Sequence, residues 1–509
     1  MRDIFISSDD AASLIKDGDT VGLVGGGGGL VEASTLHEAV ENRFLSTGYP
    51  RNITCLHSLG IGDRKERGMN RFAHEGLVSR VIGGHWVWSP RMQQMAKNNL
   101  IEAYVLPSGV LMQLLRETAA RRPGLITHVG LGTFVDPRQD GGRMNESAKD
   151  TLVDLIHIDG SEYLRYRPIP INIALLKGSF ADTSGNISLD EEPANIDLYA
   201  MAAATKNSGG KVIFQVRKRV ALGDLSAKSV RIPAPLVDAV VIDPNQKQSY
   251  QLTYNPSISG EKIDKTYRPP KPTFSVRLLV ARRARQELHT GAVINFGFGI
   301  PDQVAKLLAL EKDSHKYFQT IEHGTYGGFL LDGDLFGYAQ NPSCMIDGPS
   351  QFDFYSGGGL DIAFLGFGQV DSFGNVNASM LGGNTVGPGG FIDIAQNARK
   401  MVFCGTFDTG GAKYSIKNGK IIIKEHGKVQ KFVNNVDQIT FSGKEALRRN
   451  QQVIYVTERA VFNLSKDGLE LTEIAPGIDL QKDIIDNLGC SVKVLEELKT
   501  MDESIFYNE

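Results

Sequence analysis

Cysteine is scarce in this sequence, and its placement argues against two kinds of site. Only 4 of the 509 residues are cysteine, and they show no CxxC spacing. That pattern argues against a disulfide framework or a zinc site and fits a reducing compartment. The histidines show no HExxH or Cys/His spacing either, so we expect no metal site. The four cysteines are Cys55, Cys344, Cys404 and Cys490.

Long hydrophobic runs are absent as well. No stretch of about 18 apolar residues occurs, and the start of the chain carries acidic side chains and no apolar core of signal-peptide length. We therefore expect a cytoplasmic protein that does not contact a membrane. The formal net charge of -3 gives no reason to expect a nucleic-acid partner.

Three catalytic motifs are missing too. The GFG turn at residues 297–299 lacks the third glycine of a dinucleotide-binding fingerprint, because Asp302 stands in its place. The glycine run at 25–29 is followed by Leu30, where the last glycine would be needed. Neither a phosphate-binding loop nor a G-x-S-x-G serine elbow is present. These absences disfavour a Rossmann-type dehydrogenase, a P-loop enzyme and a serine hydrolase.

Glycine is abundant, by contrast, with 56 residues clustered in turns. This is about 11% of the chain, against a usual value of about 7%. The excess therefore points to sites lined by main chain. The length exceeds that of one ordinary hydrophobic core, so we expect at least two domains.

Two pairs of segments form an internal repeat. A helix, a strand, a glycine turn and a second helix follow one another in residues 9–40, with the second helix predicted at 31–40, and this order returns in residues 278–308. Residues 181–188 (ADTSGNIS) match residues 370–377 (VDSFGNVN), each between two apolar strands. The copies are unequally spaced, so the N-terminal half carries an insertion.

A proline-rich stretch separates the two halves. We predict an N-terminal domain at 1–255, a linker at 256–275 and a C-terminal domain at 276–509, because the linker lacks a hydrophobic period. Strands alternating with helices predict two similar open α/β domains with mostly parallel sheets. We expect the active site in the crevice between them, at the carboxyl ends of the strands.

Glu322 is the candidate nucleophile. It follows a predicted strand at 317–321 and precedes Gly324, Gly327 and Gly328, which let the chain turn and let another molecule approach. A carboxylate is already ionised at neutral pH and needs no helper base. The alternative is a solvated loop glutamate.

The GPGGF turn at residues 387–391 is a candidate oxyanion hole. Free main-chain N–H groups at the adjacent Gly389 and Gly390 could point at one oxygen. The alternative is an ordinary glycine turn.

Several motifs together resemble the family I coenzyme A transferases, especially the acetate/propionate group. They are Gly130–Pro137 (GLGTFVDP), Leu360–Gly366 (LDIAFLG), Phe373–Asn377 (FGNVN) and Gly389–Ile394 (GGFIDI). The resemblance implies two similar α/β domains and a thioester between Glu322 and CoA, with Gly389 and Gly390 holding the thioester carbonyl. It also implies that CoA is a co-substrate bound at Gly297, Gly299, Gly387 and Phe391, with no tightly bound cofactor.

Two positions depart from relatives. The 3-oxoacid CoA-transferases usually carry Ser-Glu-Asn-Gly around the nucleophile, whereas this chain has Ile-Glu-His-Gly at 321–324, which disfavours that branch. Ser108, followed by Gly109, stands where relatives carry a glutamine thought to contact the substrate. We therefore assign Ser108 and Gly109 to the substrate pocket and expect acids larger than acetate.

The resemblance predicts ping-pong transfer of CoA between acyl-CoA and short-chain carboxylic acids, by a homo-oligomer (a dimer or tetramer). One alternative is an acyl-CoA hydrolase on the same scaffold. Another is a non-catalytic CoA-binding protein, which the presence of Glu322 disfavours.

Overall fold

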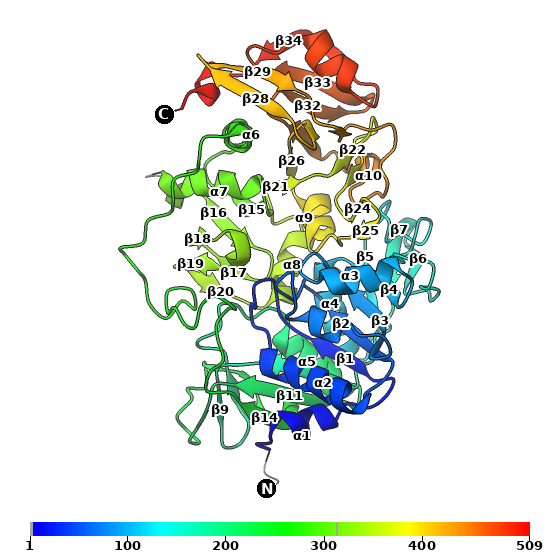
Figure 1. The fold of residues 1–509 in the computed structure, drawn as a ribbon, viewed down its shortest axis with the longest axis vertical. Coiled ribbons are helices and arrows are strands. Elements are labelled where there is room, and N and C mark those ends of the chain that lie inside the picture. The colour runs from blue at the N-terminus through cyan, green and yellow to red at the C-terminus, as the bar shows by residue number, and fades with distance from the viewer. Residues whose placement is uncertain (1–3, 312–313, 509) are drawn as a thin grey trace.

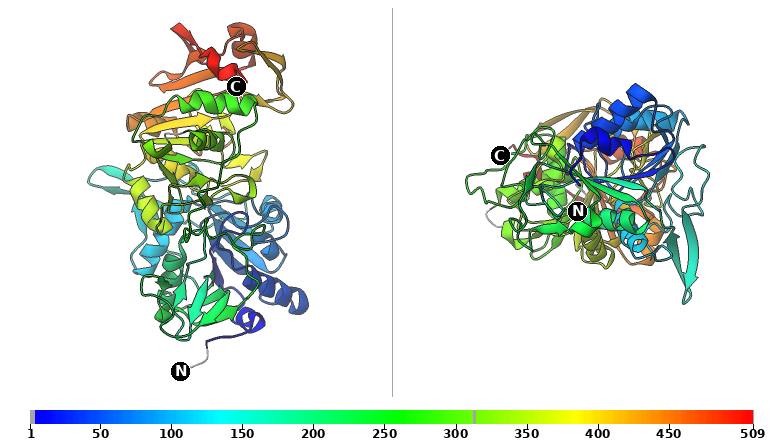
Figure 2. Two further views of the ribbon diagram at one scale, coloured as in Figure 1. Left: turned by 90° about the vertical axis from the view of Figure 1, so that its left-hand side faces the viewer. Right: turned by 90° about the horizontal axis from the view of Figure 1, so that it is seen from below.

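A computed structural model describes residues 4–311 and 314–508. The molecule is elongated, and the N-terminal and C-terminal halves of the chain lie at opposite ends (Figures 1 and 2). Among the described residues, no helix has the length and apolar character needed to cross a membrane.

The N-terminal half is built on a seven-stranded sheet in which every strand pair is parallel. The strands are buried along most of their length, as expected when helices cover both faces. In spatial order they are β14 (Ala239–Ile242), β11 (Lys211–Val216), β8 (Ile173–Lys177), β1 (Thr20–Leu23), β2 (Ile53–His57), β3 (Val78–Gly83) and β4 (Glu102–Val105).

The C-terminal half is built on a ten-stranded mixed sheet with a parallel centre, from β16 to β31. Strands paired antiparallel to their neighbours extend it on both sides, and the last strand (Lys493–Thr500) pairs parallel to its neighbour. In spatial order they are β20 (Cys344–Met345), β17 (Thr325–Tyr326), β16 (Phe318–Ile321), β15 (Val293–Phe296), β21 (Ile362–Gly366), β26 (Lys400–Cys404), β31 (Gln452–Val456), β32 (Ala460–Ser465), β33 (Gly468–Ile474) and β34 (Lys493–Thr500).

Ten α-helices are assigned in the described residues, and they pack mainly on these two sheets (Figure 1). They are α1 (Ser8–Ser13), α2 (Ser34–Thr47), α3 (Pro90–Lys97), α4 (Ser108–Ala119), α5 (Leu198–Asn207), α6 (Val276–Arg285), α7 (Pro301–Leu310), α8 (Gly348–Ser356), α9 (Phe391–Asn397) and α10 (Gly443–Arg448).

Smaller sheets, with most of their strand pairs antiparallel, complete the two halves. One is the three-stranded sheet of β5 (Leu125–Thr127), β7 (Ser161–Tyr166) and β6 (Val153–Ile158), which lies in the N-terminal half. Another contains β12 (Lys218–Val220), β9 (Phe180–Asp182), β10 (Ile187–Ser188) and β13 (Val230–Ile232). The two-stranded pairs are β18 (Phe329–Leu330) with β19 (Ala339–Gln340), β22 (Gln369–Val370) with β23 (Val376–Asn377), β24 (Met380–Leu381) with β25 (Asn384–Thr385), β27 (Asp408–Thr409) with β30 (Val429–Gln430), and β28 (Lys413–Lys417) with β29 (Lys420–Glu425).

The internal repeat is visible in the strand order. The run β14-β11-β8-β1-β2 in the first sheet corresponds to β31-β26-β21-β15-β16 in the second. The repeated turns also share their hydrogen bonds: the Asp182 carboxylate accepts from main-chain N–H groups of Ser184 and Asn186, and the Asp371 carboxylate accepts from those of Phe373 and Asn375.

Two local details concern the predicted boundaries. Helix α2 begins at Ser34 and not at 31, because Val31 adopts a left-handed φ of 51° that a helix cannot include. Residues 256–275 contain no helix or strand, although hydrogen bonds join Ser257 and Asp264 to Asn341 in the C-terminal half.

Candidate active site

Glu322 directly follows the carboxyl end of β16, and it lines one cavity together with residues of the N-terminal half. The Gly324 N–H donates to the Ile321 carbonyl at 3.0 Å, which closes the turn. Gly324 has a φ of +108°, and a Cβ there would overlap the Ile346 carbonyl oxygen. Only glycine can occupy position 324 in this turn, and this explains the glycine that follows soon after the candidate nucleophile.

The carboxyl group of Glu322 is held in a low-dielectric environment. Burial raises its pKa from an ordinary 4.5 to about 7, and a hydrogen bond from the Gly390 main chain opposes that rise. The contact is close, since a Cβ on Gly390 would overlap Oε2 of Glu322. Glycine at 390 therefore lets the main chain approach the carboxylate directly.

The structure corrects one expectation about the glycine turn. The Gly389 N–H is not free: it donates to the Gly84 carbonyl at 2.9 Å. The Gly389 carbonyl in turn accepts from the Ser108 N–H at 2.9 Å, and the Val386 carbonyl accepts from the Trp86 N–H at 2.7 Å. Gly389 thus fastens the turn to the N-terminal half, and Gly390 alone of the two offers its N–H to Glu322.

A cavity of about 410 Å³ opens beside Glu322, between the two halves of the chain. Its walls are mainly apolar and aromatic. Five of the predicted residues line it together with Glu322: Gly297, Gly387, Gly389, Gly390 and Phe391. The aromatic walls come from Trp88, Phe296, Phe298, Phe336, Phe367 and Phe391.

Three other predicted residues are not among those that line this cavity. Gly299 lies in the turn before α7, where its N–H donates to the Asp302 carboxylate at 3.0 Å. Ser108 is fully buried, and its hydroxyl donates to the Ser58 carbonyl at 2.6 Å. Gly109 is also buried, and its N–H donates to the Asp393 carboxylate at 3.1 Å. Ser108 and Gly109 therefore lie behind the glycine turn.

Arg64 was not singled out in the sequence. It lines the cavity, and its guanidinium lies over the Trp88 ring at 4.0 Å and over the Phe298 ring at 5.5 Å. Asp334, from the C-terminal half, lies 3.6 Å from its Nη1. No sequence motif predicts a role for Arg64, because the residues that it contacts are distant in sequence. The contacts link the two halves at the cavity wall.

Two histidines also line the cavity. Burial lowers the pKa of both His85 and His323 to about 4, so both rings are neutral at physiological pH. Within residues 4–311 and 314–508 no group of three or more His, Cys, Asp or Glu side chains is placed to hold a metal. The chemistry that these groups can support is attack by the Glu322 carboxylate in a cavity whose walls are mainly apolar.

Comparisons with known proteins give the family of the chain. A family model described as "Coenzyme A transferase" matches residues 5–243. The chain is 44% identical to the acetate CoA-transferase YdiF of Escherichia coli K12 over 98% of this chain and 94% of that protein. It is 42% identical to the caffeate CoA-transferase of Acetobacterium woodii over 99% and 97% of the two chains.

A solved structure gives the same result for the fold. The crystal structure of acyl-CoA transferase YdiF from E. coli O157:H7, a thioester complex with CoA, matches with a TM-score of 0.95 and 43% identity, covering 100% of this chain and 96% of that one. The predicted fold class is therefore confirmed. The chain belongs to the family I coenzyme A transferases, as its motifs predicted.

Proposed function

We propose that the protein transfers CoA between an acyl-CoA and a free carboxylic acid by a ping-pong mechanism with a glutamyl-CoA thioester at Glu322. The observation that carries this proposal is the contact between the Glu322 carboxylate and the Gly390 N–H at the wall of an apolar cavity. The names of the relatives, a CoA-transferase for acetate and one for caffeate, support the same reaction class.

The first half-reaction has two displacements. A Glu322 oxygen attacks the acyl-CoA carbonyl carbon, the C–S bond breaks, and an acyl-glutamyl anhydride and CoA thiolate are formed. The thiolate then attacks the glutamyl carbonyl carbon, and the donor acid leaves as its carboxylate. The acceptor carboxylate reverses both steps. One thioester forms for each one broken, and no net proton is transferred.

Gly390 fits the second displacement in particular. Its N–H bonds the carboxylate of Glu322 itself, so it is placed at the oxygen that becomes an oxyanion when thiolate attacks the glutamyl carbon. A main-chain donor fixed by neighbouring hydrogen bonds needs little reorganisation during the reaction. Gly389 serves this step indirectly, by fastening the turn to Gly84.

The cavity has to exclude water from the anhydride and thioester. Its apolar and aromatic walls suit that task, and its volume of about 410 Å³ leaves room beyond the smallest acids. We include short-chain acids and acids with a planar ring among the substrates to test. A cytoplasmic location and a homo-oligomeric state stay predictions from the sequence.

The test is covalent trapping at Glu322. Incubation with acetyl-CoA should add CoA to the peptide that contains Glu322, detected by mass spectrometry, and borohydride should reduce the adduct. Glu322→Ala should abolish both the adduct and turnover. An adduct on the exposed Cys344 in place of Glu322 would overturn the mechanism. Release of free thiol at the full rate without an acceptor acid would identify a hydrolase.

A further inference from the structure

Asp393 is a buried carboxylate that the proposed reaction does not use. It lies in α9, three residues after Gly390, and its side chain is fully buried. Its oxygens accept hydrogen bonds from the main-chain N–H groups of Gly109 and Val110, both at 3.1 Å. These donors belong to the first turn of α4, in the N-terminal half. The carboxylate therefore joins the two halves.

Helix α4 depends on this carboxylate for its cap. The residue before the helix is Pro107, no local side chain makes a cap hydrogen bond, and the first turn has no acidic residue. The first N–H groups of a helix have no partner within the helix, and a buried N–H without a partner is costly. Asp393 supplies that partner from the other half of the chain.

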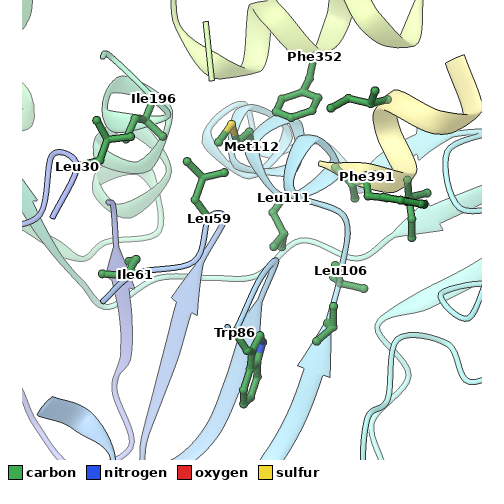
Figure 3. Close-up of a cluster of buried hydrophobic side chains, with 14 of the residues drawn as sticks. Leu30, Leu59, Ile61, Trp86, Leu106, Leu111, Met112, Ile196, Phe352 and Phe391 are labelled. Carbon is green, nitrogen blue, oxygen red and sulfur yellow. The ribbon is translucent and has the colours of Figure 1, made fainter. Parts of the chain in front are cut away.

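The residues packed around the Asp393 cap also contact the glycine turn. A Cβ on Gly109 would overlap both Asp393 and Phe352, so glycine is needed for the carboxylate to reach the helix. Phe352, from α8, also lies 3.0 Å from the Cβ position of Gly390. In Figure 3, Phe352 and Phe391 lie beside Leu111 and Met112 of α4. A displacement of Asp393 would thus reach Gly390 through shared neighbours.

The Asp393 carboxyl group lies in a strongly desolvating environment. Burial raises the pKa of Asp393 well above its ordinary value, the Glu322 charge raises it further, and the N–H groups of Gly109 and Val110 oppose the rise. The carboxyl group therefore acts on the turn through its hydrogen bonds to α4 and not through a negative charge. His85, near Gly389, is neutral.

We propose that Asp393 is a positioning residue for the CoA-transfer reaction: by capping α4 from the C-terminal half it docks the Gly389–Gly390 turn on that helix and keeps Gly390 beside Glu322. The inference rests on the proposed function. A shift of the turn would move the Gly390 N–H away from the Glu322 carboxyl group, where the oxyanion forms.

Asp393→Asn is the first variant to test. Asparagine has nearly the same shape but one acceptor oxygen, so it can accept from only one of the Gly109 and Val110 N–H groups. The rate of CoA-adduct formation on Glu322 should be measured in single-turnover mixtures over a range of acetyl-CoA concentrations. We expect the maximal rate to fall by about 10- to 100-fold. The acetyl-CoA concentration that gives half of that rate should change little, because Asp393 is not among the residues that line the cavity.

Two further variants separate docking of the turn from packing in general. Asp353→Asn is the matched control: the Asp353 carboxylate also joins the C-terminal half to α4, through Gln113 at 2.8 Å and Arg116 at 2.6 Å, but it is partly exposed. It should keep the wild-type rate of adduct formation. Asp393→Ala removes both acceptor oxygens, so its maximal rate should fall further than that of Asp393→Asn.

The outcomes are distinguishable. A wild-type maximal rate in folded Asp393→Asn overturns the proposal, and so does a loss of rate that Asp353→Asn shares. A loss of maximal rate with an unchanged half-saturating acetyl-CoA concentration supports it, because a general disturbance of packing would change both. If Asp393→Asn does not fold, Asp393→Glu takes its place: the longer side chain displaces the turn, so a wild-type rate overturns the proposal and a reduced one supports it. Absence of any Glu322 adduct in the wild type contradicts the proposed function and not the role of Asp393.

Discussion

The main chain of Gly390 lies directly against the carboxylate of Glu322, so closely that any side chain at position 390 would overlap Oε2. Gly389, its neighbour, is placed differently. Its N–H bonds Gly84, and a Cβ there would have 3.7 Å of room to the nearest atom, in His85. Two adjacent glycines therefore have separate roles, one at the nucleophile and one at the junction of the two halves.

This difference predicts unequal effects of alanine in the turn. Gly390→Ala should lower kcat by roughly 10²–10³-fold, because the methyl group displaces the carboxylate from its main-chain donor. Gly389→Ala should cost less activity and act mainly through backbone strain, since its φ is +59°. Steady-state kinetics and melting temperatures of both variants test this. Equal losses of kcat in two folded variants would contradict it.

The raised pKa of Glu322 predicts a pH dependence of the reaction. The attacking group is the ionised carboxylate, and burial raises its pKa to about 7. We therefore expect kcat/KM to rise about tenfold per pH unit well below pH 7 and to level off above it. Acyl-CoA transfer should be assayed in overlapping buffers from pH 5 to 9. A profile that is already flat at pH 5 would mean that Glu322 ionises at its ordinary value.

The same shift predicts an effect on stability. The ordinary pKa of 4.5 describes the unfolded chain and about 7 the folded one, so the folded state binds more protons between these values. Glu322 therefore lowers stability as pH rises from about 4.5 to 7. Glu322→Gln should melt at the same temperature as wild type at pH 4 and at a higher temperature at pH 8. A constant difference across that range would refute this assignment.

Ser108 should matter for packing more than for the choice of acid. Its hydroxyl bonds the Ser58 carbonyl, and the side chain is fully buried. Ser108→Ala should reduce stability by about 1 kcal/mol, and Ser108→Gln by about 1–3 kcal/mol through overpacking. Ratios of kcat/KM for acetate, propionate and butyrate should stay parallel to wild type in Ser108→Ala. A changed ratio of kcat/KM values would show that Ser108 does line the substrate pocket.

Arg64 should contribute to acyl-CoA binding. Its guanidinium lies over Trp88 at the cavity wall and is partly exposed, so Arg64→Ala should raise KM for acyl-CoA about 2- to 30-fold with a smaller change in kcat. Arg67→Ala is the matched control, because Arg67 lies over Tyr250 at 4.9 Å and is not among the residues that line the cavity. The expectation fails if both variants shift KM alike.

The sequence by itself determined the fold class and the family. The repeated order of helix, strand and glycine turn predicted two related parallel sheets, because burial and periodicity are local properties of the chain. It also predicted Glu322 at a strand end, since β-branched residues followed by glycines specify that turn locally. The start of α2 was wrong by three residues, because nothing in the sequence announces the left-handed φ of Val31.

Tertiary structure alone decided how these parts meet. Gly389 loses its free N–H to Gly84, Ser108 and Gly109 lie behind the turn, and Asp393 caps α4. Each of these outcomes is a hydrogen bond between residues far apart in the chain. Such partners are set by how the two sheets pack against each other, because a main-chain N–H donates to whatever oxygen the packing brings within about 3 Å. Local sequence patterns therefore do not predict which of these residues become hydrogen-bond partners.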